Sequence, residues 1–415
     1  MEIRRDYYIE QLKLRKNNHL VKVITGIRRC GKSYLLNKLY YDYLLSMSVK
    51  ESHIIKVALD DLESAPLLDA NKLYEYILNK IIDNDIYYVF LDEIQEVKDF
   101  VPLLNSLIKK DNLDVYITGS NSKFLSSDII TEFRGRGDEI HVNPLTFKEY
   151  YDAINLEFDE ALNEYITYGG MPFILYRETE TMKMDYLSSL YQEIYLKDIK
   201  ERYNIKNDME MGELLDILSS SIGSLTNPIK LEHTFKSVKA INISKTTINN
   251  YLKIFQESYL LRCASRYDIK GKKYINSPKK YYFTDLGLRN ARLNFRQNEE
   301  THLMENAIYN ELIARGYLVD VGVVSINEKN ENNNYIKKQI EVDFVANKGS
   351  KRYYIQSCYH LLDKEEKELR PLLALNDSFK KIIIVRDNIK LKRDDNGIIT
   401  MGLKEFLLDN DSLDR

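Results

Sequence analysis

The sequence has little of several residue types, and each shortage excludes a class of protein. Tryptophan is absent, and 415 residues contain only 3 cysteines, 7 prolines and 16 glycines. Three cysteines far apart do not form a disulfide framework, so we expect a reducing, cytoplasmic environment. There is no run of about 18 uncharged apolar residues, and the first residues, MEIRRDYYIEQLKLRK, contain no apolar core of a secretory signal. The sequence therefore predicts no contact with a membrane.

An excess of charge of one sign is also lacking. The chain has 60 Lys and Arg against 63 Asp and Glu, a formal net charge of −3. This balance excludes a uniformly basic nucleic-acid coat, but it leaves room for a local basic patch. The apolar share of 44% is typical of a globular protein, and the length suggests roughly two to four domains.

Residues 1–145 alternate short apolar segments with helical patterns. We expect strands at LVKVIT (20–25), HIIKVA (53–58), YYVFL (87–91) and VYIT (115–118). Apolar strands separated by helices are typical of a parallel sheet that is covered on both faces. The predicted fold class of this part is therefore α/β.

Directly after the first of these segments, residues 26–33 read GIRRCGKS and match the phosphate-binding pattern G-x-x-x-x-G-K-[ST]. Gly26 and Gly31 let backbone N–H groups point at phosphate oxygens, and the next helix presents its positive end to the same anion. We expect Lys32 to reach the β- and γ-phosphates and the Ser33 hydroxyl to ligate Mg²⁺. The residues expected to contact the nucleotide are Gly26, Ile27, Arg28, Arg29, Cys30, Gly31, Lys32, Ser33 and Tyr34.

The segment YYVFL ends in two acids, Asp92 and Glu93. We expect Asp92 to hold Mg²⁺ through water and Glu93 to orient and polarise the attacking water. The alternative is that these acids only cap the following helix. Another strand ends in Ser120 and Asn121; either could touch the γ-phosphate or the attacking water, although both are also common turn residues.

Two arginines in TEFRGRGDEIHV, Arg134 and Arg136, are candidates for stabilising charge in the transition state. An arginine finger acts either in cis or across a subunit interface, and the sequence leaves both open. The alternative is a surface ion pair with Glu132 or Asp138. Of the two arginines, we favour Arg136.

Residues 227–292 contain the local basic patch. They carry fourteen Lys or Arg and four Asp or Glu, a local charge of +10. Two helices followed by two strands, with KGKK (270–273) between the strands, are the layout of a winged helix-turn-helix. The lysines suit phosphate contacts with DNA; the alternatives are a protein partner or a solvated face. The exposed face of the second helix has side chains suited to bases or phosphates: Lys245, Thr246, Asn249 and Asn250.

Residues 293–415 have the layout of restriction-endonuclease-like nucleases: an acid on a helix, an acid on a strand, and [E/Q]-x-K on the next strand. In such enzymes the acids bind Mg²⁺ and the lysine positions the attacking water. Here the last motif reads Gln356 and Cys358, so one carboxylate and the cation are missing. We expect a nuclease fold kept for binding or assembly. Its vestigial site would comprise Glu305, Asp343, Gln356 and Cys358, and the strand EVDFVA that carries Asp343 also carries Glu341.

Taken together, the motifs cover nearly the whole chain. It resembles the prokaryotic AAA-type P-loop ATPases whose C-terminal half is a domain of unknown function with a nuclease-like end. The resemblance supports Lys32, Ser33, Asp92 and Glu93 as ATPase residues, and Arg136 as the arginine after the sensor strand. The segments that carry it are GIRRCGKS, FLDEIQ, ITGSNS, FRGR followed by PLTFKEY, YGGMP, YYFTDLGLRN, MENAIYNEL, EVDFV and YYIQSC.

The resemblance also implies a domain order. It comprises an AAA-like P-loop core (1–145), a helical lid (146–226), a winged helix (227–292) and a mixed α/β, degenerate nuclease-like domain (293–415). The leading hypothesis is an ATPase that uses ATP and Mg²⁺ and couples its nucleotide state to a C-terminal half that binds DNA or a protein partner. A homo-oligomer is also implied as a partner. The alternatives are an ATP-gated nuclease and a nucleotide-bound interaction module with little turnover.

Overall fold

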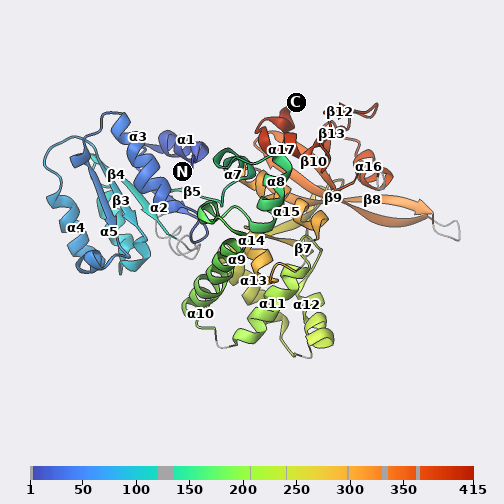
Figure 1. Ribbon diagram of the computed structural model, residues 1–415, viewed down its shortest axis with the longest axis horizontal. Helices are drawn as coiled ribbons and strands as arrows, with labels where there is room; N and C mark the ends of the chain where they lie inside the picture. The colour runs from blue at the N-terminus through green and yellow to red at the C-terminus, as the bar shows by residue number, and fades with distance from the viewer. Residues whose placement is uncertain are drawn as a thin grey trace. The chain divides into compact units, whose positions relative to one another are not determined.

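The computed structural model describes residues 3–119, 135–205, 207–239, 241–296, 299–329, 335–360 and 365–415. The chain divides into two compact units (Figure 1). Unit 1 comprises Met1–Pro144 with Glu257–Tyr259, and unit 2 comprises Leu145–Gln256 with Leu260–Arg415. In the ranges just given, no helix is long and apolar enough to cross a membrane.

Unit 1 is built on a parallel sheet with the strand order β2-β3-β4-β1-β5. The four strands predicted from the sequence are confirmed to within two residues, whereas β5 was not predicted. Its sequence, GDEIH, is mostly polar and gives no apolar signal. The strands are β1 (Val21–Thr25), β2 (Ile54–Ala58), β3 (Tyr87–Asp92), β4 (Leu113–Thr118) and β5 (Gly137–His141).

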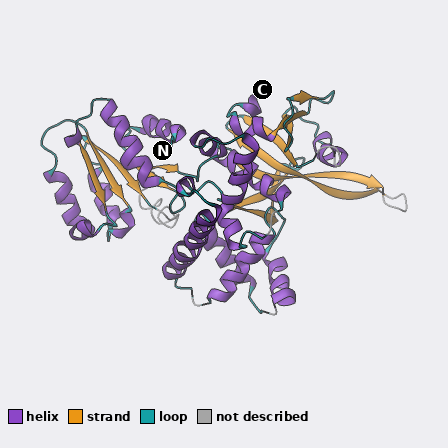
Figure 2. Ribbon diagram, in the orientation of Figure 1, coloured by secondary structure: helices purple, strands orange, loops and turns teal. Residues whose placement is uncertain are grey.

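Helices cover both faces of this sheet (Figure 2). One face packs on α4 and α5, where Leu73 and Leu104 are fully buried. On the other face Tyr40 packs against Phe90, and its hydroxyl lies 2.7 Å from that of Tyr116. Burial on both faces explains why the strands are almost continuously apolar. The helices of unit 1 are α1 (Asp6–Arg15), α2 (Lys32–Tyr34), which continues as a π-helix (Leu35–Tyr40) into α3 (Tyr41–Ser46), α4 (Ala70–Asn79) and α5 (Phe100–Leu107).

Unit 2 begins with helices and ends in a mixed sheet with the order β12-β13-β11-β10-β9-β8-β6-β7. The two strands expected in the winged helix, β6 and β7, belong to this sheet because β6 pairs in parallel with β8. Its strands are β6 (Leu261–Asp268), β7 (Lys273–Phe283), β8 (Leu318–Lys329), β9 (Tyr335–Lys348), β10 (Lys351–Cys358), β11 (Lys380–Val385), β12 (Lys392–Arg393) and β13 (Ile399–Gly402).

The helices after residue 145 pack with this sheet. Phe147 of α7 and Phe158 of α8, both from the expected lid, share one core with Tyr282 and Phe344 of the sheet. The helices of unit 2 are α7 (Phe147–Ala153), α8 (Phe158–Tyr168), α9 (Glu180–Ser189), α10 (Lys197–Tyr203), α11 (Asp208–Ser220), α12 (Pro228–Thr234), α13 (Lys245–Glu257), α14 (Leu286–Arg292), α15 (Glu300–Ala314), α16 (Glu365–Leu373) and α17 (Leu403–Leu408).

Candidate nucleotide-binding site

The glycines of GIRRCGKS occupy backbone positions that other residues rarely adopt. Gly26 has a φ of 141°, and a Cβ there would lie 2.1 Å from the carbonyl oxygen of Val142. Gly31 has a φ of 99° and directly precedes α2. Both residues therefore shape a tight loop that leads from β1 directly into the helix start.

Lys32 lies inside this loop. Its side chain is buried, and its ammonium group donates to the carbonyl oxygens of Gly26 at 3.1 Å and Ile27 at 3.2 Å. Four other predicted contact residues of the loop are exposed to solvent. They are Arg28, Arg29, Ser33 and Tyr34.

Contacts within unit 1 hold the loop at Cys30. The Cys30 thiol donates to the carbonyl oxygen of Val142 at 3.3 Å, and burial raises the pKa of this thiol, so Cys30 is a packing residue. The buried Arg5 guanidinium donates to the carbonyl oxygens of Cys30 at 3.3 Å and Asn143 at 2.7 Å. Sequence reasoning missed Arg5, because nothing in its local pattern connects it to a loop that follows β1.

Asp92 ends β3 in a buried position beside the P-loop helix. The Thr118 hydroxyl at the end of β4 donates to Asp92 Oδ1, and the Asn37 amide donates to Asp92 Oδ2 at 3.2 Å. Burial raises the pKa of Asp92, an effect that hydrogen bonds from Thr118 and Ser33 partly offset. Ser33 and Asp92, the two expected Mg²⁺ ligands, therefore lie near each other. Neither Thr118 nor Asn37 was singled out from the sequence.

Glu93 follows Asp92 in the left-handed backbone region, with a φ of 51°. Its N–H donates to Thr118 Oγ1 at 2.9 Å, and its carboxylate accepts a hydrogen bond from the Gln95 amide. The Glu93 side chain makes no capping hydrogen bond to the following turn, Ile94–Glu96. The structure therefore does not support the alternative that Glu93 caps this turn.

The strand order explains why these residues meet. β4 lies between β1 and β3, and all three strands are parallel. Their carboxyl ends therefore lie at one edge of the sheet, where ligands of open α/β sheets bind. The P-loop, Thr118 and the Asp92–Glu93 pair come from these three ends. Ser120, Asn121 and Arg134 lie outside the described residues.

Arg136 lies at the opposite end of this sheet, beside the first residue of β1. It directly precedes β5, its carbonyl oxygen accepts the N–H of Val21 at 2.9 Å, and its guanidinium donates to Asn105 at 3.0 Å. Val21 begins β1 and Thr25 ends it, so the strand separates Arg136 from the P-loop by roughly 13 Å. The structure therefore does not bring Arg136 together with Lys32 and Glu93 of its own chain.

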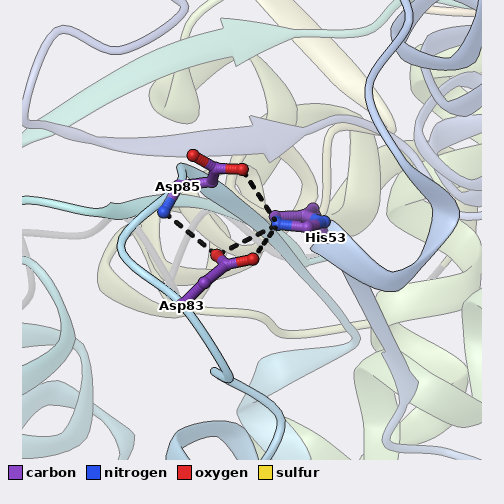
Figure 3. Close-up of side chains that lie close together, drawn as sticks. All are labelled: His53, Asp83 and Asp85. Carbon is purple, nitrogen blue, oxygen red and sulfur yellow. Dashed lines mark hydrogen bonds and ion pairs between the residues drawn. The ribbon is translucent and has the colours of Figure 1, made fainter.

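A histidine and two aspartates also lie close together in unit 1 (Figure 3). His53 Nε2 lies 3.1 Å from both carboxylate oxygens of Asp83 and 3.6 Å from Asp85 Oδ2, and the buried ring stacks on Tyr87. The group lies where β2 and β3 begin, which is the edge away from the P-loop. We interpret it as a set of hydrogen bonds that holds the loop before β3.

The predicted nuclease-like residues lie in unit 2. Glu305, Glu341 and Asp343 meet there around Lys280, which sequence reasoning did not place in this site. Gln356 accepts the N–H of Asp343 at 2.7 Å. Cys358 lies in a separate apolar cluster, as expected for a packing residue.

Comparisons with known proteins agree with the fold of unit 1. Residues 18–151 match the family described as AAA domain, and residues 159–299 match a domain of unknown function (DUF8612). The P-loop, the strand ends and the first of these matches define the class of protein, an AAA-type protein with an ATP-binding fold.

Two relatives resemble nearly the whole chain. An uncharacterised protein of Haemophilus influenzae is 32% identical over 388 residues, which cover 92% of this chain and 93% of that protein. The uncharacterised protein MJ1544 of Methanocaldococcus jannaschii is 32% identical over 414 residues, which cover 94% of this chain and 86% of that protein. The chain therefore belongs to the family that these two proteins represent.

Solved structures are more distant. The ORC1 protein of Aeropyrum pernix, solved in complex with DNA, covers 70% of this chain and 92% of its own at 11% identity, with a TM-score of 0.29.

Proposed function

We propose that the protein binds ATP with Mg²⁺ at the P-loop and hydrolyses it. In this proposal the nucleotide state controls how the C-terminal half binds DNA or a protein partner. The observation that supports the catalytic part is the convergence of the P-loop, Thr118 and the Asp92–Glu93 pair at the carboxyl edge of β1, β4 and β3.

Each residue has a role that fits its position. Lys32 exchanges its carbonyl partners for phosphate oxygens, and the N–H groups at the start of α2 bind the same anion. Glu93, held by Gln95 and left free of a capping role, orients the attacking water and accepts its proton.

The donor set fits a magnesium ion. Ser33 is exposed at the helix start and its hydroxyl acts to lower the pKa of Asp92, so a hydroxyl and a carboxylate lie near each other. Oxygen ligands of this kind, together with phosphates and water, are what Mg²⁺ prefers. When bound, Mg²⁺ neutralises charge on the β- and γ-phosphates.

We further propose that Arg136 acts on the nucleotide of a neighbouring copy of this chain. Arg136 lies at the edge of the sheet away from its own P-loop, and its side chain is exposed. An arginine finger supplied across an interface stabilises the transition-state charge at a neighbour's nucleotide, so it does not need to reach the P-loop of its own chain. This proposal requires a homo-oligomer.

The surface proposed for DNA or a partner lies on α13 and on the hairpin between β6 and β7. Ser244 caps α13 through the N–H of Thr247 at 3.1 Å, and the predicted recognition face, Lys245, Thr246, Asn249 and Asn250, is exposed. Lys270, Lys272 and Lys273 are exposed at the hairpin. Exposed cations grouped in this way favour phosphate contacts.

The first experiment measures ATP binding and turnover. Lys32→Ala should abolish both, because its ammonium group is the phosphate contact. Lys38→Ala is the matched control, since Lys38 is exposed on the same helical stretch and pairs with Asp42 at 2.7 Å. Turnover by Lys32→Ala at the wild-type rate would contradict the proposed site.

The second experiment measures turnover with single- and double-stranded DNA over a salt series. We expect stimulation that weakens steeply as salt rises, because phosphate contacts release counterions. Lys272→Ala with Lys273→Ala should reduce the salt dependence by about one unit of slope for each lost phosphate contact. A turnover rate that DNA never changes, in an oligomer that retains ATP, would favour the interaction module with little turnover.

A further inference from the structure

The nuclease-like cluster of unit 2 contains a buried lysine at its centre. Lys280 comes from β7 and is 4% exposed. Its ammonium nitrogen lies 2.9 Å from Glu305 Oε1 of α15, 2.6 Å from Glu341 Oε1 of β9 and 3.9 Å from Asp343 Oδ1 of the same strand. β7, β9 and α15 thus share one charged centre.

The carboxylates around Lys280 are also satisfied by other protein groups. The Tyr282 hydroxyl donates to Glu305 at 2.6 Å, and the N–H of Ser357 donates to Asp343 at 2.8 Å. Gln356, which stands where a nuclease carries its third acid, accepts the N–H of Asp343 and donates to Glu368 at 2.7 Å. Gln356 therefore takes part in a closed hydrogen-bond network.

A divalent cation does not fit this arrangement. In the described part of the chain, only one group of three His, Cys, Asp or Glu residues has its ligand atoms within 4.8 Å of one another, and it comprises His53, Asp83 and Asp85. The oxygens of Glu305, Glu341 and Asp343 do not come this close together. The group on which Glu305 and Glu341 converge is the ammonium of Lys280. An ammonium and a divalent cation in the same space repel each other.

The backbone covers one side of the cluster. A Cβ on Gly223 would lie 3.2 Å from Glu305 Oε1, so this segment runs directly against the carboxylate. The N–H of Gly223 donates to Tyr281 at 3.2 Å, and Thr226 exchanges two hydrogen bonds with Lys279. The segment is therefore fastened to β7 beside Lys280, and it blocks the approach of a phosphodiester to Glu305 from this side.

We infer that Lys280 takes the place of the divalent cation of the nuclease-like fold. Unit 2 is thereby held together by an internal ammonium group, without a metal ion, and it does not cleave DNA. The ion pairs also join β7, and with it the basic hairpin, to the C-terminal sheet.

Manganese binding and thermal unfolding of the full-length, nucleotide-free chain test this inference. An Asp92→Asn background removes the carboxylate of the two proposed metal ligands at the P-loop, and no nucleotide is present, so the outcome is independent of the proposed ATPase. In this background we expect equal unfolding temperatures in EDTA and in Mn²⁺. Stabilisation by Mn²⁺ that disappears when Asp343→Asn is added would overturn the inference.

Lys280→Met in the same background provides a second, opposite outcome. Removing the ammonium leaves buried carboxylates without a cation, so the unfolding temperature should fall by roughly 10 °C in EDTA and recover when Mn²⁺ fills the space. Lys273→Met, an exposed lysine of the same strand, should change neither value. Equal stability of Lys280→Met and the parent chain in EDTA would overturn the inference. If Lys280→Met does not fold, the effect of Mn²⁺ on the unfolding temperature with and without Asp343→Asn still tests the inference.

Plasmid nicking in Mg²⁺ or Mn²⁺ supplies an independent readout. We expect no cleavage above that of the chain that carries Asp343→Asn. Cleavage that requires Asp343 would overturn the inference and identify a metal-dependent nuclease in its place.

Discussion

The Thr118 hydroxyl donates a hydrogen bond to the Asp92 carboxylate, and the same oxygen accepts the N–H of Glu93 at 2.9 Å. One side chain at the end of β4 thus orients both acids at the end of β3. Since Asp92 is buried, its orientation depends on these few polar partners.

Thr118→Val should impair ATP hydrolysis without unfolding unit 1. Valine keeps the shape of threonine but removes the donor to Asp92, and loss of a partner that orients a metal ligand costs about 10–100-fold. We expect a higher Mg²⁺ concentration for half-maximal turnover and a lower maximal rate. Thr118→Ser, which keeps the hydroxyl, is the control and should stay close to the wild type.

Glu93→Gln should bind ATP but turn it over at least about 100-fold more slowly, because the amide cannot accept the proton of the attacking water. Binding of a fluorescent ATP analogue and steady-state phosphate release separate the two effects. Glu96→Gln serves as the matched control, since Glu96 is exposed three residues later. Wild-type turnover by Glu93→Gln would show that another group acts as the base.

Arg136→Ala should lower turnover by about 10³-fold or more if Arg136 is an arginine finger. Because Arg136 lies at the sheet edge away from its own P-loop, the loss should be complemented between chains. Mixing Arg136→Ala with Glu93→Gln pairs an intact Glu93 of one chain with an intact Arg136 of another, so activity should return. A mixture as inactive as its two components would argue against action across an interface.

Stability of unit 2 should depend on the protonation of Asp285. This carboxylate begins α14 and accepts the N–H groups of Gly170 at 2.7 Å and Leu288 at 3.0 Å. Burial raises the pKa of Asp285 to about 6, although backbone N–H groups act to lower it. The pKa in the unfolded chain is about 4, so the folded state binds the proton more tightly.

The contribution of Asp285 to stability should therefore rise as the pH falls from about 7 to about 4, by up to about 3 kcal/mol. Asp285→Asn lacks a titrating group at this position, so the difference in unfolding free energy between wild type and variant should change across this window. Urea unfolding at several pH values measures it. Asp395→Asn, at an exposed turn, should follow the wild type at every pH. A difference independent of pH would show that Asp285 stays ionised in the folded protein.

Much of the fold of unit 1 could be predicted from the sequence, since its strands are buried on both faces and read as short apolar runs. The sequence did not predict β5, because its residues are mostly polar and lack this signal. Only its pairing with β1 identifies it as a strand. In unit 2 the two strands of the expected winged helix belong to the larger sheet. Pairing between β6 and β8 joins segments that no local periodicity connects.

The sequence by itself determined the residues that lie next to a strand end, namely the P-loop with Lys32 and the Asp92–Glu93 pair. Their chemistry is encoded in a few consecutive residues, and the strand before each of them sets its position. Only the tertiary structure decided which strand ends are neighbours. It showed that Thr118 contacts Asp92, that Arg136 lies at the end of the sheet away from the P-loop, and that Lys280 lies among the nuclease-like acids. These relations depend on strand order and on contacts between distant segments, which arise from packing as a whole and leave no mark in the local pattern.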